Sequence, residues 1–224
     1  WTTDYIQTAD IDLLSDSTDI KPIGINGNTF SGDYDGGNYS ISNWSYVDPN
    51  FATTDACEAW VGVFGYAFSN VFSNIRLTGV FSLHGFNQYG GLLVGRTSSV
   101  DIFNITCDFD VGTDIAHGAS PGTINAGSLV GYYGGGTFTG IDIKGTFAFV
   151  LDAGATAVGG VVGYLRNVTA SLITFSPTLS GLSGNNIGGF TATLHDSTIS
   201  NSINAMTGDI AGSNFAAGFY GTGG

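Results

Sequence analysis

Short apolar runs closed by glycine recur along the chain. The clearest copy is Gly91-Leu92-Leu93-Val94-Gly95, and a weaker copy, Gly189-Phe190-Thr191-Ala192, ends in alanine. The closing residues stand at positions 65, 95, 131, 163, 192 and 221, so the successive spacings are 30, 36, 32, 29 and 29 residues. A period in this range is typical of stacked structural repeats, none of which can bury its apolar face alone.

Two further β-rich runs complete each unit. The second run begins about ten residues after the closing position, and the third is more variable, with 80–83 and 147–150 as its best examples. No unit contains a helical period long enough for a stable helix. Three short strands per unit predict an all-β parallel β-helix of roughly five or six coils over residues 49–224. The closing glycines would lie at corners, where either φ is positive or neighbouring backbone comes very close.

Residues 1–48 do not follow the repeat and are predicted to form an N-terminal capping segment. Residues 5–13 alternate in part and suggest a pair of strands, and Asp35-Gly36 is a turn signal between two more. Two longer connections interrupt the repeats that follow. Residues 49–60 contain a candidate helical turn, and residues 113–126 form the longest excursion, which accounts for the spacing of 36.

The N-terminal segment also carries a family resemblance. It reads Tyr-Ile-x-Thr-Ala-Asp-Ile-Asp-Leu from Tyr5, Pro-Ile-Gly from Pro22, and Phe-Ser-Gly-x-Tyr-Asp-Gly-Gly-Asn-Tyr-x-Ile-Ser-Asn from Phe30. These motifs, with the Gly-Leu-Leu-Val-Gly core, resemble bacterial and algal surface proteins built from GLUG repeats. The resemblance implies a right-handed parallel β-helix in an exported, adhesin-like protein, in which the repeats themselves are not catalytic.

Composition narrows the classes of partner. Five Lys and Arg against 18 Asp and Glu give a net charge of −13, which opposes binding to nucleic acid and to acidic membrane surfaces. An anionic polysaccharide would need a bridging cation. No apolar run approaches the roughly 18 residues that a membrane-spanning helix needs. The resemblance to GLUG-repeat surface proteins implies an extracellular or cell-surface protein.

The two cysteines, Cys57 and Cys107, are the minimum for one disulfide. They lie in neighbouring repeats, and an extracellular setting favours the bond. The alternative is a pair of free, buried thiols.

Four Asn-x-Ser/Thr sequons are candidate N-glycosylation sites if the protein follows a eukaryotic secretory route. Asn167 and Asn38 follow turns and are the best candidates, with Asn43 and Asn104 after them. Asn104 stands at the same repeat position as Asn74. It could instead belong to an internal asparagine ladder, in which stacked amides join neighbouring coils.

Catalytic and metal-binding patterns are weak, so no catalytic, metal or cofactor site is predicted. Asp33, Asp35 and Asn38 superficially resemble a calcium loop but lack its later Glu, and Asp35-Gly36 fits the turn of a β-hairpin better. Asp108, Asp110 and Asp142 could form a carboxylate cluster for glycoside hydrolysis, or simply a solvated acidic face. The remaining candidates for acid–base chemistry are scattered among the repeat positions: Lys21, Arg76, Arg96, Lys144, Arg166, His84, His117 and His195.

These patterns favour an extracellular structural or adhesive solenoid over an enzyme. The expected partners are further copies or neighbouring repeats of the same polypeptide, as in a head-to-tail filament or a longer surface array. The alternative is a carbohydrate-binding or polysaccharide-cleaving β-helix module.

Overall fold

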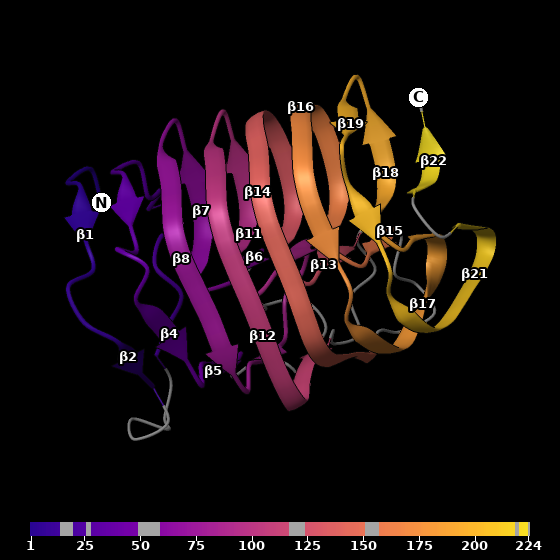
Figure 1. The fold of residues 1–224 in the computed structure, drawn as a ribbon, viewed down its shortest axis with the longest axis horizontal. Coiled ribbons are helices and arrows are strands. Elements are labelled where there is room, and N and C mark those ends of the chain that lie inside the picture. Colours follow the sequence, from indigo (N-terminus) through magenta and orange to yellow (C-terminus); the bar gives the residue numbers. More distant parts are fainter. Residues whose placement is uncertain are drawn as a thin grey trace.

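The computed structural model describes residues 1–13, 20–25, 28–48, 59–116, 124–150, 157–217 and 220–223, with backbone alone for 181–184, 209–217 and 220–223. The described residues form only strands and connections, wound into a parallel β-solenoid of about five turns (Figure 1). The N- and C-terminal ends of the chain lie at opposite ends of the stack. Within these residues there is no helix of the length and apolarity that crossing a membrane requires.

Most coils contain several short strands in chain order. In the N-terminal segment they are β1 (Tyr5–Ile6), β2 (Ile11–Asp12), β3 (Tyr34–Asp35), β4 (Ser40–Ser42) and β5 (Ser45–Val47). In the first full coils they are β6 (Trp60–Val61), β7 (Phe64–Phe68), β8 (Val71–Gly79), β9 (Ser82–His84), β10 (Tyr89–Gly90), β11 (Val94–Ser98) and β12 (Asp101–Ala116). The later coils contain β13 (Asn125–Gly127), β14 (Val130–Val150), β15 (Ala157–Gly159), β16 (Val162–Phe175), β17 (Thr178–Gly188), β18 (Thr191–His195), β19 (Thr198–Ser200), β20 (Ile203–Asn204), β21 (Thr207–Ala217) and β22 (Tyr220–Gly223).

The predicted repeat register is confirmed. Val94 pairs in parallel with Phe64 on one side and with Val130 on the other, and the same ladder continues through Val162 and Thr191 to Tyr220. Each of these residues directly precedes a closing position, so all six closing positions stack in one column. The weak copy that ends at Ala192 keeps its place in this column.

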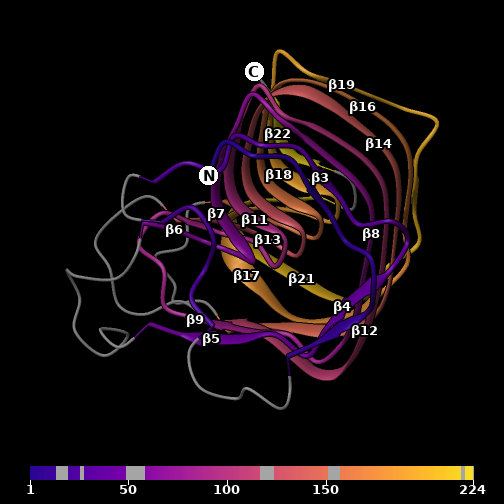
Figure 2. The same ribbon diagram turned by 90° about the vertical axis from the view of Figure 1, so that its left-hand side faces the viewer.

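The winding is right-handed, as predicted. Figure 2 views the stack from its N-terminal end, and the chain passes clockwise from β7 through β8 to β9 while later coils recede from the viewer. The three predicted runs per coil are present, and the structure adds a short fourth run. This run is formed by β6, β10, β13 and β15, which pair in parallel with one another just before the glycine-bounded core.

The closing glycines are required by close packing of backbone. A Cβ atom on Gly131 would lie 2.6 Å from the backbone nitrogen of Gly90 and 2.7 Å from the carbonyl oxygen of Gly95. A Cβ atom on Gly163 would lie 2.6 Å from the carbonyl oxygen of Gly131. No closing glycine from 65 to 163 is among the positive-φ residues. Of the two predicted reasons for glycine, close approach is therefore the correct one.

Positive φ angles instead occur at other corners, and several of the residues there are asparagines. One corner column contains Asn74 (φ 53°), Asn104 (φ 56°), Gly140 (φ 66°) and Leu172 (φ 54°), each at the equivalent place in successive coils. Asparagine tolerates this left-handed conformation better than most residues. The corner also reverses the inward and outward alternation, which lets the strands on both sides of it bury apolar residues.

The interior is a stack of aliphatic and aromatic ladders. Ile75, Ile105, Ile141 and Ile173 pair directly in four successive coils, and each is at most 1% exposed. Tyr133 is fully buried, and its hydroxyl lies 2.7 Å from the carbonyl oxygen of Val100 and 2.6 Å from that of Thr137. The hydroxyl can therefore donate to a carbonyl inside the core, which explains a buried tyrosine beside the outward-facing Tyr132.

The N-terminal segment begins the same solenoid with incomplete coils. β1 pairs in parallel with β3, and β2 with β4, while β3 and β4 both pair in parallel with β8. The interpretation of Asp35-Gly36 as a hairpin turn is therefore wrong, because its flanking strands run around a solenoid corner and do not pair with each other. Gln7 is 6% exposed at this end of the core, and its side chain is fully engaged with Ala9, Ser40 and Tyr34.

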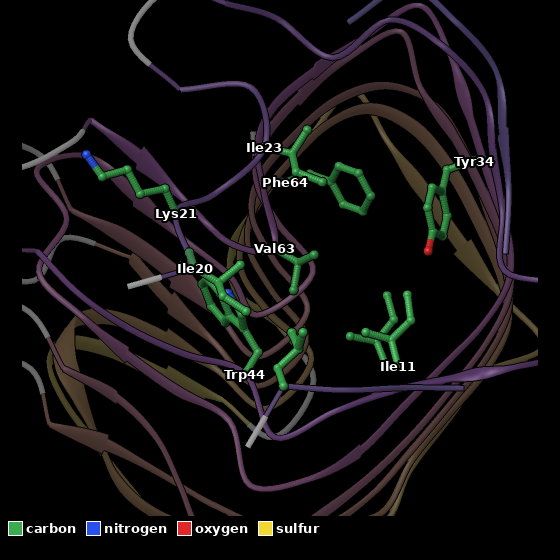
Figure 3. Close-up of a pocket in the computed structure, with 10 residues that line it drawn as sticks. Ile11, Ile20, Lys21, Ile23, Tyr34, Trp44, Val63 and Phe64 are labelled. Carbon is green, nitrogen blue, oxygen red and sulfur yellow. The ribbon is translucent and has the colours of Figure 1, made fainter. Parts of the chain in front are cut away.

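A pocket of about 150 Å³ lies beneath this segment, at the N-terminal end of the core. Figure 3 shows Ile11, Val63, Phe64 and Tyr34 around the opening, while the amine of Lys21 points away from it. The lining is almost entirely apolar. The capping segment therefore covers the first full coil less tightly than the later coils cover one another.

Candidate functional site

The strongest surface feature is a group of aromatic side chains around Arg96. Strands β7, β11, β14 and β16 bring Tyr66, Arg96, Tyr132 and Tyr164 into one outward column, because each directly follows a closing glycine. The short strands β6 and β10 place Trp60 and Tyr89 in a second column beside it. We call these six residues the Arg96 cluster.

The guanidinium of Arg96 lies among four rings. Its central carbon is 5.2 Å from the ring centroids of Trp60 and Tyr66, 5.6 Å from Tyr132 and 5.7 Å from Tyr89. These are cation–π distances, and each such contact is worth roughly 0.5–1 kcal/mol at an exposed site. The rings of Tyr132 and Tyr164 stack at 5.2 Å with an interplanar angle of 17°, which extends the cluster by one more coil.

The two columns also touch each other. Ring centroids are 5.0 Å apart for Trp60 and Tyr66, and 5.1 Å apart for Tyr89 and Tyr132. The indole nitrogen of Trp60 donates to the Gln88 side-chain oxygen at 3.3 Å. Burial raises the pKa of Tyr89, although the positive charge of Arg96 acts in the opposite direction. All six side chains are half-buried, so the cluster is held firmly and still reaches solvent.

Arg96 has polar capacity that the protein does not use. Its Nε atom is buried without a hydrogen-bond partner, and no ion pair joins Arg96 to any acidic residue in the described part of the chain. By contrast, Lys144 lies 3.6 Å from the Asp108 carboxylate. The rings stabilise the corner, and the guanidinium and ring faces together form a surface suited to binding an external group.

Sequence reasoning missed this cluster, although a signal was present. In the first four copies the residue after the closing glycine is tyrosine three times and arginine once: Tyr66, Arg96, Tyr132 and Tyr164. Comparing that position across repeats identifies an outward column. Arg96 was instead grouped with the other basic residues, which are scattered among the repeat positions.

The sequon asparagines fall into two groups. The Asn104 amide donates to the Asn74 side-chain oxygen at 2.6 Å, and the Asn74 amide donates to Asp35 Oδ1 at 3.0 Å. The proposed asparagine ladder is therefore present, but at an exposed corner and not in the interior. Asn43 likewise donates to Asp12 at 2.8 Å and accepts from the Val80 backbone at 3.1 Å.

Asn38 and Asn167 differ from those two. All four asparagines have positive φ, and the difference lies in their bonding: Asn38 and Asn167 are exposed, and neither side-chain amide makes a hydrogen bond within the described residues. Their amides are exposed and not engaged, and glycosylation at Asn167 and Asn38 stays a prediction.

The predicted disulfide is not seen. Cys107 is a free, fully buried thiol that stacks between Leu77 and Ile143 in an interior ladder, and burial strongly raises its pKa. Its expected partner, Cys57, lies outside the described residues. An inward position on β12 makes Cys107 part of the aliphatic core.

The three aspartates that were candidates for glycoside hydrolysis, Asp108, Asp110 and Asp142, do not pair with one another in neighbouring coils. Asp108 pairs in register with Lys144, and Asp142 pairs with Thr106, while Asp110 is exposed. In the N-terminal segment, Asp33 accepts the Val71 backbone at 2.8 Å and Asp35 accepts Gly37 and Asn74. These hydrogen bonds stabilise the corners of the first coils. Within the described residues no group of three or more metal-binding side chains forms.

Two of the three histidines, His84 and His195, lie beside an aspartate in the structure. His84 Nε2 lies 2.9 Å from Asp114 Oδ2 and 3.1 Å from the Ser82 hydroxyl, which donates to Asp114 Oδ1 at 2.7 Å. The hydrogen bond with Asp114 raises the pKa of His84 despite burial. His195 lies 2.8 Å from the neighbouring Asp196, and His117 lies outside the described residues.

Comparison of the chain with known protein families, with curated proteins and with solved structures finds no match. The β-solenoid fold agrees with the GLUG resemblance, but no family match identifies the repeats as GLUG repeats.

Proposed function

We propose that the protein is an extracellular adhesive solenoid, which holds a binding surface rigidly outside the cell. The observation that carries this proposal is the Arg96 cluster. Trp, Tyr and Arg are the residues that most often dominate binding energy at protein surfaces. Here all six cluster side chains are of these three kinds.

The scaffold supports this role because it fixes the cluster before any partner arrives. Strand β11 pairs in parallel with β7 on one side and with β14 on the other, and β14 also pairs with β16, so Arg96 and Tyr132 are held by neighbouring strands on both sides. A preorganised surface loses little conformational entropy on binding. Sugar rings, whose C–H faces are apolar, pack well on aromatic rings, and their hydroxyls accept hydrogen bonds from a guanidinium.

A glycan array tests the adhesive role. The purified protein should bind a subset of immobilised glycans, and Tyr132→Ala should weaken that binding at least tenfold. Phe103→Ala is the matched control, because Phe103 is a 39% exposed aromatic residue outside the cluster on the neighbouring strand β12. The absence of binding to any glycan, or equal loss in both variants, would contradict the proposal.

A second candidate role, self-association along the solenoid axis, rests on the N-terminal end. Trp1, Ile6 and Ile11 are 58%, 72% and 39% exposed there. Among the described strands, β1 and β2 each have a parallel partner on one side only. A neighbouring repeat or a second copy could pair with these free edges and cover the apolar side chains.

Electron microscopy and sedimentation test this second role. The wild type should form end-to-end oligomers whose population falls in Ile6→Lys, because a charge would be buried at the junction. Val150→Lys is the control, since Val150 is also 58% exposed but lies on β14 in the middle of the stack. A monomer at all concentrations would exclude the end-to-end role and leave the adhesive one standing.

A further inference from the structure

We propose that the Arg96 cluster selects saccharides that carry a single carboxylate, with the carboxylate on Arg96 and the sugar ring against the tyrosines. This inference rests on the adhesive role proposed above and names its ligand class. A terminal uronic acid on an otherwise neutral oligosaccharide has this chemistry. The ligand would be recognised by one charge and one apolar face.

The case for a carboxylate begins with the state of Arg96. The protein has 18 acidic residues and only five basic ones, yet Arg96 is placed beside aromatic rings and away from acidic partners in the described residues. Arginine is the side chain that binds carboxylates through two parallel hydrogen bonds and also stacks on aromatic faces. Rings on both neighbouring coils hold the guanidinium in place for such a contact.

The case for a sugar comes from what surrounds the guanidinium. Tyr132 stacks on Tyr164 in the next coil, and Tyr89 lies 5.1 Å from Tyr132 in the adjoining column. An acceptor group bound to Arg96 therefore has aromatic surface beside it along the solenoid axis. Each tyrosine also has a hydroxyl that can bond to a sugar hydroxyl.

The case for one carboxylate, and against many, comes from the field of the whole protein. A net charge of −13 repels a polyanion at a distance, and Arg96 is the one cation in the cluster. A chain of uronic acids would bring further carboxylates towards a protein of net negative charge, while the cluster itself supplies a single cation. We therefore expect the order of affinity to be singly acidic over neutral, and neutral over polyanionic.

Isothermal titration calorimetry on the full chain tests the proposal. The probes are a disaccharide ending in glucuronic acid, the same disaccharide ending in glucose, and polyglucuronate. The wild type should bind the acidic disaccharide at least tenfold more tightly than the neutral one. Arg96→Gln, which keeps hydrogen-bond donors and removes the charge, should abolish this preference, so that the acidic and neutral disaccharides bind to the variant with affinities within about twofold of each other.

Two controls separate binding from folding. Arg166→Gln removes a positive charge from an exposed position on β16, outside the cluster, and should keep the preference. Melting temperatures establish that both variants are folded, and a cluster variant that does not fold is replaced by Arg96→Lys, which should lose most of the preference because the bidentate geometry is gone. Equal affinity for acidic and neutral disaccharides, or a preference that survives in Arg96→Gln, would overturn the ligand class without touching the adhesive role. The glycan array decides that role separately.

Discussion

The middle coils and the N-terminal capping segment use the same parallel pairing to different effect. In the middle coils Val94, Val130 and Val162 each have a paired residue in the coil on either side, and all three are fully buried. In the capping segment β1 and β2 are two residues long, Ile6 is 72% exposed, and a pocket of about 150 Å³ lies beneath. Stability in a solenoid therefore comes from neighbouring coils more than from the strands themselves.

The largest expected difference in stability comes from placing an aspartate in each of the two regions. Val130→Asp should abolish cooperative unfolding or soluble expression, because an unpaired carboxylate in the core costs several kcal/mol. Ile6→Asp in the capping segment should change the unfolding free energy by less than about 0.5 kcal/mol. Val150→Asp controls for the substitution itself, since it lies on the same strand as Val130 but is 58% exposed. A native melting profile for Val130→Asp would refute the stacked core.

The glycine corner gives the next largest effect. Gly131→Ala places a Cβ against the backbone of Gly90 and Gly95, so it should destabilise the protein by about 1–3 kcal/mol in urea unfolding. Ala192→Gly, at the same position of a later coil, should cost only about 0.5–1 kcal/mol through backbone entropy. If Gly131→Ala were as stable as the wild type, the close-approach explanation of the corner would fail.

Adding one methylene should have opposite effects in the two regions. Val63→Ile adds volume at the wall of the N-terminal pocket, where Figure 3 shows Val63 beside the opening, and should stabilise the protein by about 0.8 kcal/mol. Val130→Ile adds the same group to a filled interior and should destabilise it by about 1 kcal/mol. The same sign for both changes in urea midpoints would mean that the regions are equally well packed.

The smallest expected effect is a pH dependence of stability that arises from His84 and Asp114. His84 lies where the two regions meet, because it is on β9 and pairs with Val47 on β5 of the capping segment. The bond with Asp114 raises the pKa of His84 above its ordinary 6.5, so its contribution is full below that pH and is lost as pH rises through the folded pKa. For Asp114, burial is outweighed by bonds from His84 and Ser82, which lower the pKa, so its contribution is lost as pH falls below about 3.8. Both side chains are partly exposed, so the effect should stay under about 1 kcal/mol.

Urea midpoints at pH 5.5 and pH 9 measure this effect. The wild type should lose slightly more stability between these values than His84→Gln. An identical pH dependence in the two proteins would show that the pair contributes nothing.

The sequence predicted the stacking better than the surface. The glycine-bounded cores set the register because their backbones must touch, and that constraint is visible as a period. Asp35-Gly36 misled because a local turn signal is the same in a hairpin and at a solenoid corner; only pairing with β8 distinguishes them. The Arg96 cluster was missed because its members lie in different repeats and meet only when coils are stacked. Cys107 shows the same limit, since its inward direction depends on the corner at Asn104.

The most direct test of the account measures the stack itself. Arg76, Thr106, Asp142, Thr174 and Ile203 follow one another in register through successive coils. Spin labels on cysteines at Arg76 and Ile203, in a Cys57→Ser background, should report backbone positions about 19 Å apart, four coil steps along the axis. Moving the second label from Ile203 to Thr174 should shorten the separation by about 4.8 Å. A separation that is much longer, or that does not change with this move, would contradict the parallel stacking of the coils.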